Sequence, residues 1–172
     1  MRFKKYITKS PSQTKGLGKN LAKEILKSPP QKEALILGLK GDLGGGKTTF
    51  LQGFAMGLGI KEKILSPTFV IIKKFSITEP RNSGAKVKIK TKSSSPSKSK
   101  FSNFYHIDCY RIERLKGVLD LGFREIISDS QNIVTIEWAD RIDKILPAKA
   151  IIINFEFVDQ KTRKITIGFK ND

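Results

Sequence analysis

Residues 41–48 read G-x-x-x-x-G-K-T, the pattern of a phosphate-binding loop, and this stretch constrains the fold of the chain most strongly. The apolar run 34–39 precedes it and predicts a buried strand of a parallel sheet. Apolar residues at helical spacing follow it, and Gly57 and Gly59 mark where we expect that helix to end. The motif requires this order of strand, loop and helix, so the stretch predicts an α/β fold that binds a nucleotide.

The residue types of the loop suit phosphate chemistry. Glycines allow the backbone to turn tightly and to bring N–H groups against phosphate oxygens, and the helix N-terminus adds its positive end. We expect Lys47 to reach the β- and γ-phosphates of ATP and the hydroxyl of Thr48 to bind Mg²⁺. The residues expected to line the nucleotide in this loop are Gly41, Asp42, Leu43, Gly44, Gly45, Gly46, Lys47, Thr48 and Thr49.

The other periodic segments predict how the sheet is completed. We expect a helix that ends before Pro29, a hairpin of 69–75 with 101–107, a turn and short helix within 115–127, and a C-terminal β-hairpin of 150–157 with 163–169. Antiparallel hairpins beside a parallel phosphate-loop region predict a mixed parallel/antiparallel sheet. The expected architecture is one P-loop NTPase-like domain over 1–172, with three layers.

Two acidic residues end apolar strands, where they can face the phosphate loop. Asp108 ends the strand around 104–107, and a carboxylate there can hold the metal shell or orient a water. Glu137 ends the β-branched run from Ile133, as the acid of a Walker B strand does, and is a candidate for Mg²⁺ directly or through water. His106 is expected to be a packing or hydrogen-bonding residue rather than a base. Trp138 either packs over the site or belongs to the core.

Two further segments have open interpretations. Thr68 follows Ser-Pro, where it either faces the γ-phosphate as a switch threonine or belongs to an ordinary turn. Residues 81–100 hold seven basic residues and no acidic one, out of a formal net charge of +17 for the chain. This basic insertion is either a solvated excursion of the hairpin or an arm that contacts a polyanion such as tRNA.

The composition of the chain indicates the cellular compartment in which we expect it. No apolar run approaches the roughly 20 residues that a membrane span needs, and the basic N-terminus lacks the apolar stretch of a signal peptide. The single cysteine, Cys109, excludes an internal disulfide and fits a reducing environment. We therefore expect a cytoplasmic protein with no membrane partner.

The motifs, taken in order, resemble those of the TsaE (YjeE) family of small bacterial ATPases. The residues that carry the resemblance are the loop 41–50, Ser-Pro-Thr-Phe at 66–69, His-Ile-Asp-Cys-Tyr-Arg-Ile at 106–112, Leu-Gly at 121–122 with Glu125, and Ile-Glu-Trp at 136–138. The chain departs from the family pattern at Gly45, where the family usually has Ala, and at Cys109, where it has Leu.

This resemblance implies a role in threonylcarbamoyl modification of tRNA adenosine beside the anticodon, with TsaB- and TsaD-like partners. It implies that Thr48 and Glu137 bind Mg²⁺ and that Asp108 takes part in ATP hydrolysis. It also implies that Thr14, before the first helix, and Arg163, in the last hairpin, contact the nucleotide. Lys47, Asp108 and Glu137 are thus the expected catalytic residues.

Three other functions compete with this interpretation. A GTPase is disfavoured because the chain has no N-K-x-D motif to recognise guanine, and a small-molecule kinase lacks a segment suited to be a substrate lid. The net charge of +17 suggests the third, an RNA-binding module in which the nucleotide is structural.

Overall fold

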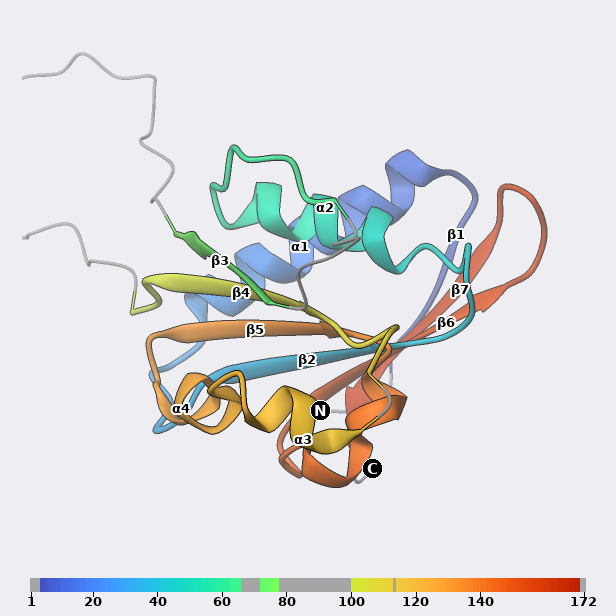
Figure 1. Cartoon of the computed structure of the whole chain (residues 1–172). Coiled ribbons are helices and arrows are strands. Elements are labelled where there is room, and N and C mark those ends of the chain that lie inside the picture. Colours follow the sequence, from blue (N-terminus) through green and yellow to red (C-terminus); the bar gives the residue numbers. More distant parts are fainter. Residues whose placement is uncertain (1–3, 66–71, 78–99, 113, 171–172) are drawn as a thin grey trace, which may run out of the picture.

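A seven-stranded mixed sheet forms the centre of the protein, in the order β1-β7-β6-β2-β5-β4-β3 (Figure 1). The computed structural model describes residues 4–65, 72–77, 100–112 and 114–170. The strands are β1 (Lys4–Thr8), β2 (Leu35–Lys40), β3 (Ile72–Ser76), β4 (Asn103–Asp108), β5 (Asn132–Glu137), β6 (Ile151–Phe157) and β7 (Arg163–Phe169). The helices are α1 (Pro11–Lys27), α2 (Lys47–Gly57), α3 (Leu115–Leu119), α4 (Phe123–Ser128) and the 3-10 helix η1 (Ala139–Ile145).

The helices cover both faces of the sheet. Strands β4, β5, β2 and β6 are parallel, whereas β3, β7 and β1 join the two edges in antiparallel pairs. Helices α1 and α2 lie on one face, and α3, α4 and η1 lie on the other (Figure 1). The predicted three-layer α/β fold, its mixed sheet and its C-terminal hairpin of β6 and β7 are therefore confirmed.

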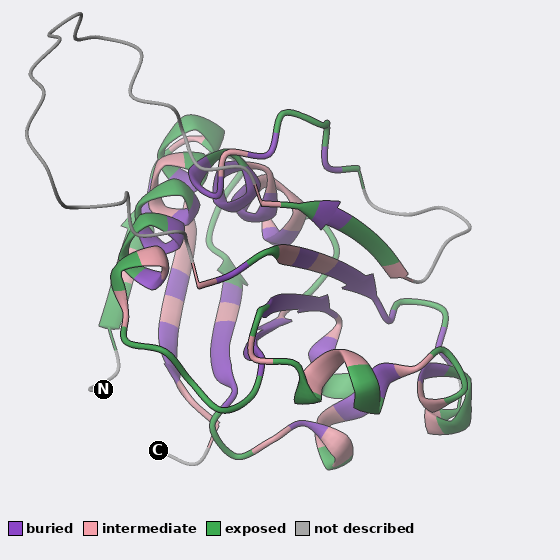
Figure 2. Ribbon diagram, turned by 90° about the vertical axis from the view of Figure 1, so that its left-hand side faces the viewer, coloured by how far each residue is buried: buried purple, intermediate pink, exposed green. Residues whose placement is uncertain are grey.

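The central strands are apolar because both of their faces are covered. Every residue of β5 is buried, and Figure 2 shows burial concentrated on the sheet and on the inner sides of the helices. On the α1–α2 face, the core contains Phe50, Phe54 and Phe104, none of which has exposed surface. On the other face Val118 and Ile142 are equally buried, so the site at the end of the sheet rests on two packed cores.

Helices α1 and α2 approach each other at their glycines. A Cβ atom added to Gly18 would lie 2.2 Å from the carbonyl oxygen of Phe50, and one added to Gly53 would lie 1.9 Å from that of Lys15. Only glycine permits such a backbone contact. The start of α1 is thereby held beside α2, the helix that follows the phosphate loop.

The structure differs from the sequence-based expectation in three places. Strand β1 was not expected, because most of its residues are polar and exposed; it forms by antiparallel pairing with β7. The segment 115–127 contains two short helices instead of one, separated at Gly122, which has a φ of 77°. The 3-10 helix η1 was also not expected. Thr68 and most of the basic insertion 81–100 lie outside the described residues.

Candidate nucleotide-binding site

The phosphate loop connects the end of β2 to the start of α2. Gly41, Gly44 and Gly46 have φ angles of 130°, 74° and 98°, which disfavour residues with a side chain. A Cβ atom on Gly41 would also lie 2.2 Å from the carbonyl oxygen of Phe155 on β6. The glycines therefore fix the path of the loop, and the backbone N–H of Phe50 donates to Gly46 at 2.9 Å to begin the helix.

Lys47 is buried at the mouth of this loop, with 5% of its surface exposed. Its Nζ donates to the carbonyl oxygens of Gly41 at 2.6 Å and Asp42 at 2.9 Å, and it lies 3.9 Å from the centre of the Trp138 ring. Burial lowers the pKa of Lys47 from its ordinary value, while the charges of Glu137 and Asp108 oppose that shift. The site thus places a partly desolvated ammonium group among backbone carbonyls, an aromatic face and two carboxylates.

Thr48 and Glu137 come together from α2 and β5. The hydroxyl of Thr48 donates to Oε2 of Glu137 at 2.9 Å, and Nε2 of His106 lies 2.9 Å from Oε1 of the same carboxylate. Glu137 and His106 are 2% and 1% exposed, so the acid is oriented from both sides inside the protein. The expectation that His106 is a hydrogen-bonding residue agrees with this contact.

A hydroxyl beside a carboxylate is the kind of oxygen pair that Mg²⁺ binds next to substrate phosphates. Within the part of the chain that the structure describes, no group of three or more His, Cys, Asp or Glu side chains gathers as a metal site. Thr48 and Glu137 fit a magnesium ion that takes its remaining ligands from phosphate and water, and they do not form a complete protein cage.

Asp108 lies one strand away, directly across from Glu137 in the register of β4 and β5. It is 7% exposed, and its Oδ1 accepts the backbone N–H of Tyr110 at 2.9 Å. The N–H of Cys109 donates to the carbonyl of Glu137 at 3.0 Å and ties the two strand ends together. The two acids expected from the sequence therefore share one edge of the sheet with the loop.

Thr14 and Arg163 flank the loop from α1 and β7. The Thr14 hydroxyl hydrogen-bonds to that of Thr8 at 2.8 Å, and its methyl carbon lies 3.8 Å from the Cβ position of Gly46. Nε of Arg163 donates to the carbonyl oxygen of Gly44 at 3.1 Å. Both residues lie at the rim of the loop, but Thr14 lies in the first turn of α1 and not before the helix as expected, because α1 already begins at Pro11 behind its cap Ser10.

Trp138 has an unusual backbone conformation, with a φ of 57°. It is half-buried and packs against Tyr110, with ring centres 5.0 Å apart, as well as against Lys47. The geometry agrees with both interpretations of Trp138, because its ring lies over Lys47 in the site and also packs against the core of this face of the sheet. No sequence pattern indicates that a tryptophan will adopt a left-handed conformation, so its contact with Lys47 was not foreseen.

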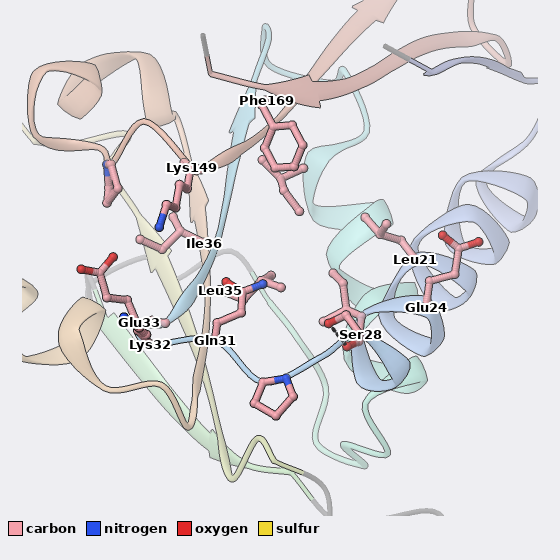
Figure 3. Close-up of a pocket in the computed structure, with 16 residues that line it drawn as sticks. Leu21, Glu24, Ser28, Gln31, Lys32, Glu33, Leu35, Ile36, Lys149 and Phe169 are labelled. Carbon is pink, nitrogen blue, oxygen red and sulfur yellow. Dashed lines mark hydrogen bonds between the residues drawn. The ribbon is translucent and has the colours of Figure 1, made fainter. Parts of the chain in front are cut away.

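A cavity of 740 Å³ lies at the other end of the parallel strands (Figure 3). It is lined by the last turns of α1, the start of β2 and the start of β6, including Ile25, Leu35 and Ile151. None of its lining residues belongs to the phosphate loop, so the cavity is separate from the candidate site.

No helix in the described part of the chain is long and apolar enough to cross a membrane.

Comparison with known proteins identifies a family. The model of a family described as "Threonylcarbamoyl adenosine biosynthesis protein TsaE" matches residues 8–165. The tRNA threonylcarbamoyladenosine biosynthesis protein TsaE of Bacillus subtilis is 34% identical over 166 residues, which cover 96% of this chain and 85% of the relative. The protein of the same name from Treponema pallidum is 29% identical, with coverages of 79% and 83%. The crystal structure of Bacillus subtilis YdiB superposes with a TM-score of 0.67 at 29% identity, covering 96% of this chain and 84% of that one.

Proposed function

The chain belongs to the TsaE family of tRNA threonylcarbamoyladenosine biosynthesis proteins, and from this premise we propose that it binds and hydrolyses ATP to support that modification. Its role in the pathway is that of a supporting subunit. We propose three things beyond the family: that the chain hydrolyses ATP, that this hydrolysis depends on Mg²⁺, and which residues perform it.

The contact between Thr48 and Glu137 carries the proposal. Thr48 is the last residue of the phosphate-loop motif, and its hydroxyl lies 2.9 Å from a carboxylate that comes from the neighbouring strand. A buried acid at this hydroxyl suits a loop that binds its nucleotide together with Mg²⁺, on which the proposed hydrolysis depends. The pair would hold Mg²⁺, which supplies positive charge to the β- and γ-phosphate oxygens when it is bound.

The other residues of the loop act by position and charge. The backbone N–H groups of 41–48 and the N-terminus of α2 would bind phosphate oxygens, and Lys47 would neutralise charge that develops on the γ-phosphate. Arg163 and Thr14 would contact the nucleotide from the rim of the loop. Asp108 and Glu137 are the carboxylates in position to orient the attacking water, with Asp108 the residue further from Thr48 along the sheet.

We expect the isolated chain to turn over slowly. Lys47 is held by two carbonyl oxygens of its own loop, and a partner that reshapes this edge would complete the site. TsaD-like and TsaB-like proteins are the proposed partners, and the TsaD-like protein would transfer the threonylcarbamoyl group to tRNA. ATP hydrolysis would then drive or reset the assembly.

Titration of ATP, followed by measurement of phosphate release with and without Mg²⁺, tests the proposal. Lys47→Ala should abolish tight binding and hydrolysis, and Glu137→Gln should reduce hydrolysis by about 100-fold, as for removal of one electrostatic group from a catalytic site. Lys116→Ala is the matched control, because this lysine is exposed on α3 and outside the site. A Lys47→Ala variant with full binding and hydrolysis would refute the proposal.

Two further measurements test the proposed ATPase against a GTPase and test its proposed partners. Side-by-side titration with GTP distinguishes an ATPase from a GTPase, and equal or tighter GTP binding would favour the GTPase. A pull-down of TsaD-like and TsaB-like proteins with and without ATP tests the partners. If neither protein is retained in either condition, the proposed assembly is wrong, although the ATPase activity would stand.

A further inference from the structure

Helix α1 carries a row of four lysines on its exposed surface. We name the lysine row as Lys15, Lys19, Lys23 and Lys27, all of which are exposed. Their four-residue spacing places neighbouring Cα atoms about 6 Å apart and the two ends about 18 Å apart along the helix. The row therefore presents a line of regularly spaced positive charges.

No carboxylate in the described part of the chain neutralises this row. The lysines there that pair with acids are Lys40, Lys164 and Lys170, and none of them belongs to α1. Glu24 is the single acidic residue of the helix, and it forms no ion pair with a described lysine. The charge of the lysine row thus remains open to a partner.

Close contacts with α2 fix the backbone of the lysine row, and the row begins beside the phosphate loop. A Cβ atom on Gly53 would lie 1.9 Å from the carbonyl oxygen of Lys15, and one on Gly57 would lie 2.6 Å from that of Lys19, so α2 fixes the backbone of the row. Thr14, at the rim of the nucleotide site, directly precedes Lys15. At the other end, Nζ of Lys100 donates to the carbonyl oxygens of Ser28 and Pro29 and brings a fifth cation to the end of α1.

We propose that the lysine row binds the phosphate backbone of tRNA. Phosphates recur at regular intervals along a nucleic-acid strand, and a fixed line of lysines can neutralise several of them together. Lysine contacts phosphate as a point charge and does not recognise bases, so the binding is independent of sequence. The choice of RNA rests on the family's role in tRNA modification and does not depend on ATP hydrolysis.

The structure favours RNA over an anionic membrane. A helix that lies on a membrane inserts large apolar side chains beside its basic residues. The apolar residues Leu21 and Ile25 of α1 face inward and are 6% and 5% exposed, so they are not available for insertion. Leu17 and Leu26 are half-buried and pack against the core, and the exposed residues of α1 after Pro11 are all polar or charged.

The salt dependence of tRNA binding tests this proposal. The full-length variant with Lys15, Lys19, Lys23 and Lys27 all changed to Gln keeps the helix propensity of the wild type, since Gln and Lys are similar helix formers. The control changes Lys116, Lys144, Lys149 and Lys161 to Gln. These four are also exposed and without described ion pairs, and none lies on α1 or α2. The two variants have the same net charge.

We expect the lysine-row variant to bind tRNA at least about 10-fold more weakly at low salt, and the slope of log K against log[salt] to decrease in magnitude by about 3. The control variant should lose less than half as much tRNA affinity as the lysine-row variant, and its salt slope should change by less than half as much. Circular dichroism and an ATP titration should match the wild type, which separates failure of this proposal from failure of the ATP-binding proposal.

Three outcomes would overturn the proposal. The first is no tRNA binding by the wild type at low salt. The second is an equal loss of affinity in the two variants, which would indicate that net charge alone decides the binding. In the third, vesicles of phosphatidylserine and phosphatidylcholine bind in a manner that depends on the lysine row, whereas tRNA does not. That result would assign the row to a membrane surface.

Discussion

Substitution of Gly18 by alanine tests whether the close contact of α1 with α2 supports both the fold and the site. The added Cβ would lie 2.2 Å from the carbonyl oxygen of Phe50 and 3.0 Å from the backbone nitrogen of Phe54. Ordinary van der Waals contact begins at 3.4 Å, so the helices must separate by about 1.2 Å at this point. The obstacle is backbone, which cannot rotate away as a side chain does.

The expected loss of stability is the difference between two effects. Alanine gains about 1 kcal/mol over glycine in a helix interior, whereas overpacking costs about 1–3 kcal/mol. Phe50 and Phe54 have no exposed surface, so the separation disturbs fully packed rings, and we take the upper end of that range. Gly18→Ala should therefore lower the free energy of unfolding by about 2 kcal/mol, or the melting temperature by roughly 4–8 °C.

Gly16→Ala is the matched control on the same helix. A Cβ atom at Gly16 meets nothing within 4 Å, so this variant should gain up to about 1 kcal/mol from helix propensity alone. Urea denaturation of both variants measures the contrast, which should be about 3 kcal/mol. ATP affinity should fall in Gly18→Ala only, because α1 positions Thr14 beside Gly46. Equal stability of the two variants would refute the reasoning.

Three other predictions concern single side chains. Asp143 hydrogen-bonds to Lys40 at 2.8 Å, which lowers the Asp143 pKa below its ordinary 3.8. Because both side chains are partly exposed, Asp143→Asn should cost at most about 0.5 kcal/mol. This stabilisation is present above pH 3.8 and is lost as the pH falls through the lowered pKa. Wild type and variant should therefore become equal in acid-dependent denaturation once the pH is below that pKa, and a constant difference would contradict it. Burial raises the pKa of Cys109 to about 12. Iodoacetamide at pH 8 should therefore label the denatured chain quickly and the native chain very slowly. Rapid labelling of the native chain would show that the thiol is accessible. His106→Ala removes a partner of Glu137 and should raise the Mg²⁺ concentration required for ATP hydrolysis about 10-fold, whereas an unchanged requirement would limit His106 to packing.

The part of the site that sequence could predict is the part that follows from local rules. The spacing of glycines and Lys47 defines a phosphate loop wherever a strand precedes it and a helix follows it. Asp108 and Glu137 could be placed at one edge because the carboxyl ends of parallel strands meet there. Which acid contacts Thr48 depends on the strand order, since β5 lies next to β2 and β4 lies one strand further away.

The missed features depend on contacts between distant residues. Strand β1 carries exposed Lys4 and Lys5 and lacks the apolar run of a core strand, so its pairing with β7 could not be inferred from its own residues. That pairing places Thr8 where its hydroxyl contacts Thr14 at 2.8 Å. The position of Thr14 at the loop thus depends on an edge strand for which the sequence has no local signal.

If the proposed ATP binding holds, the contacts of Lys47 would limit how tightly this loop binds the nucleotide. Its ammonium group already has two carbonyl acceptors, at 2.6 and 2.9 Å, and an aromatic face at 3.9 Å. A phosphate must replace these contacts, so the free energy that it gains from Lys47 is the difference between a charge-assisted bond and the bonds that are lost. A partner that moves Trp138 would weaken the hold on Lys47 and favour its transfer to phosphate. On the proposed function, a partner that contacts Tyr110 and Trp138 would therefore change the affinity for ATP.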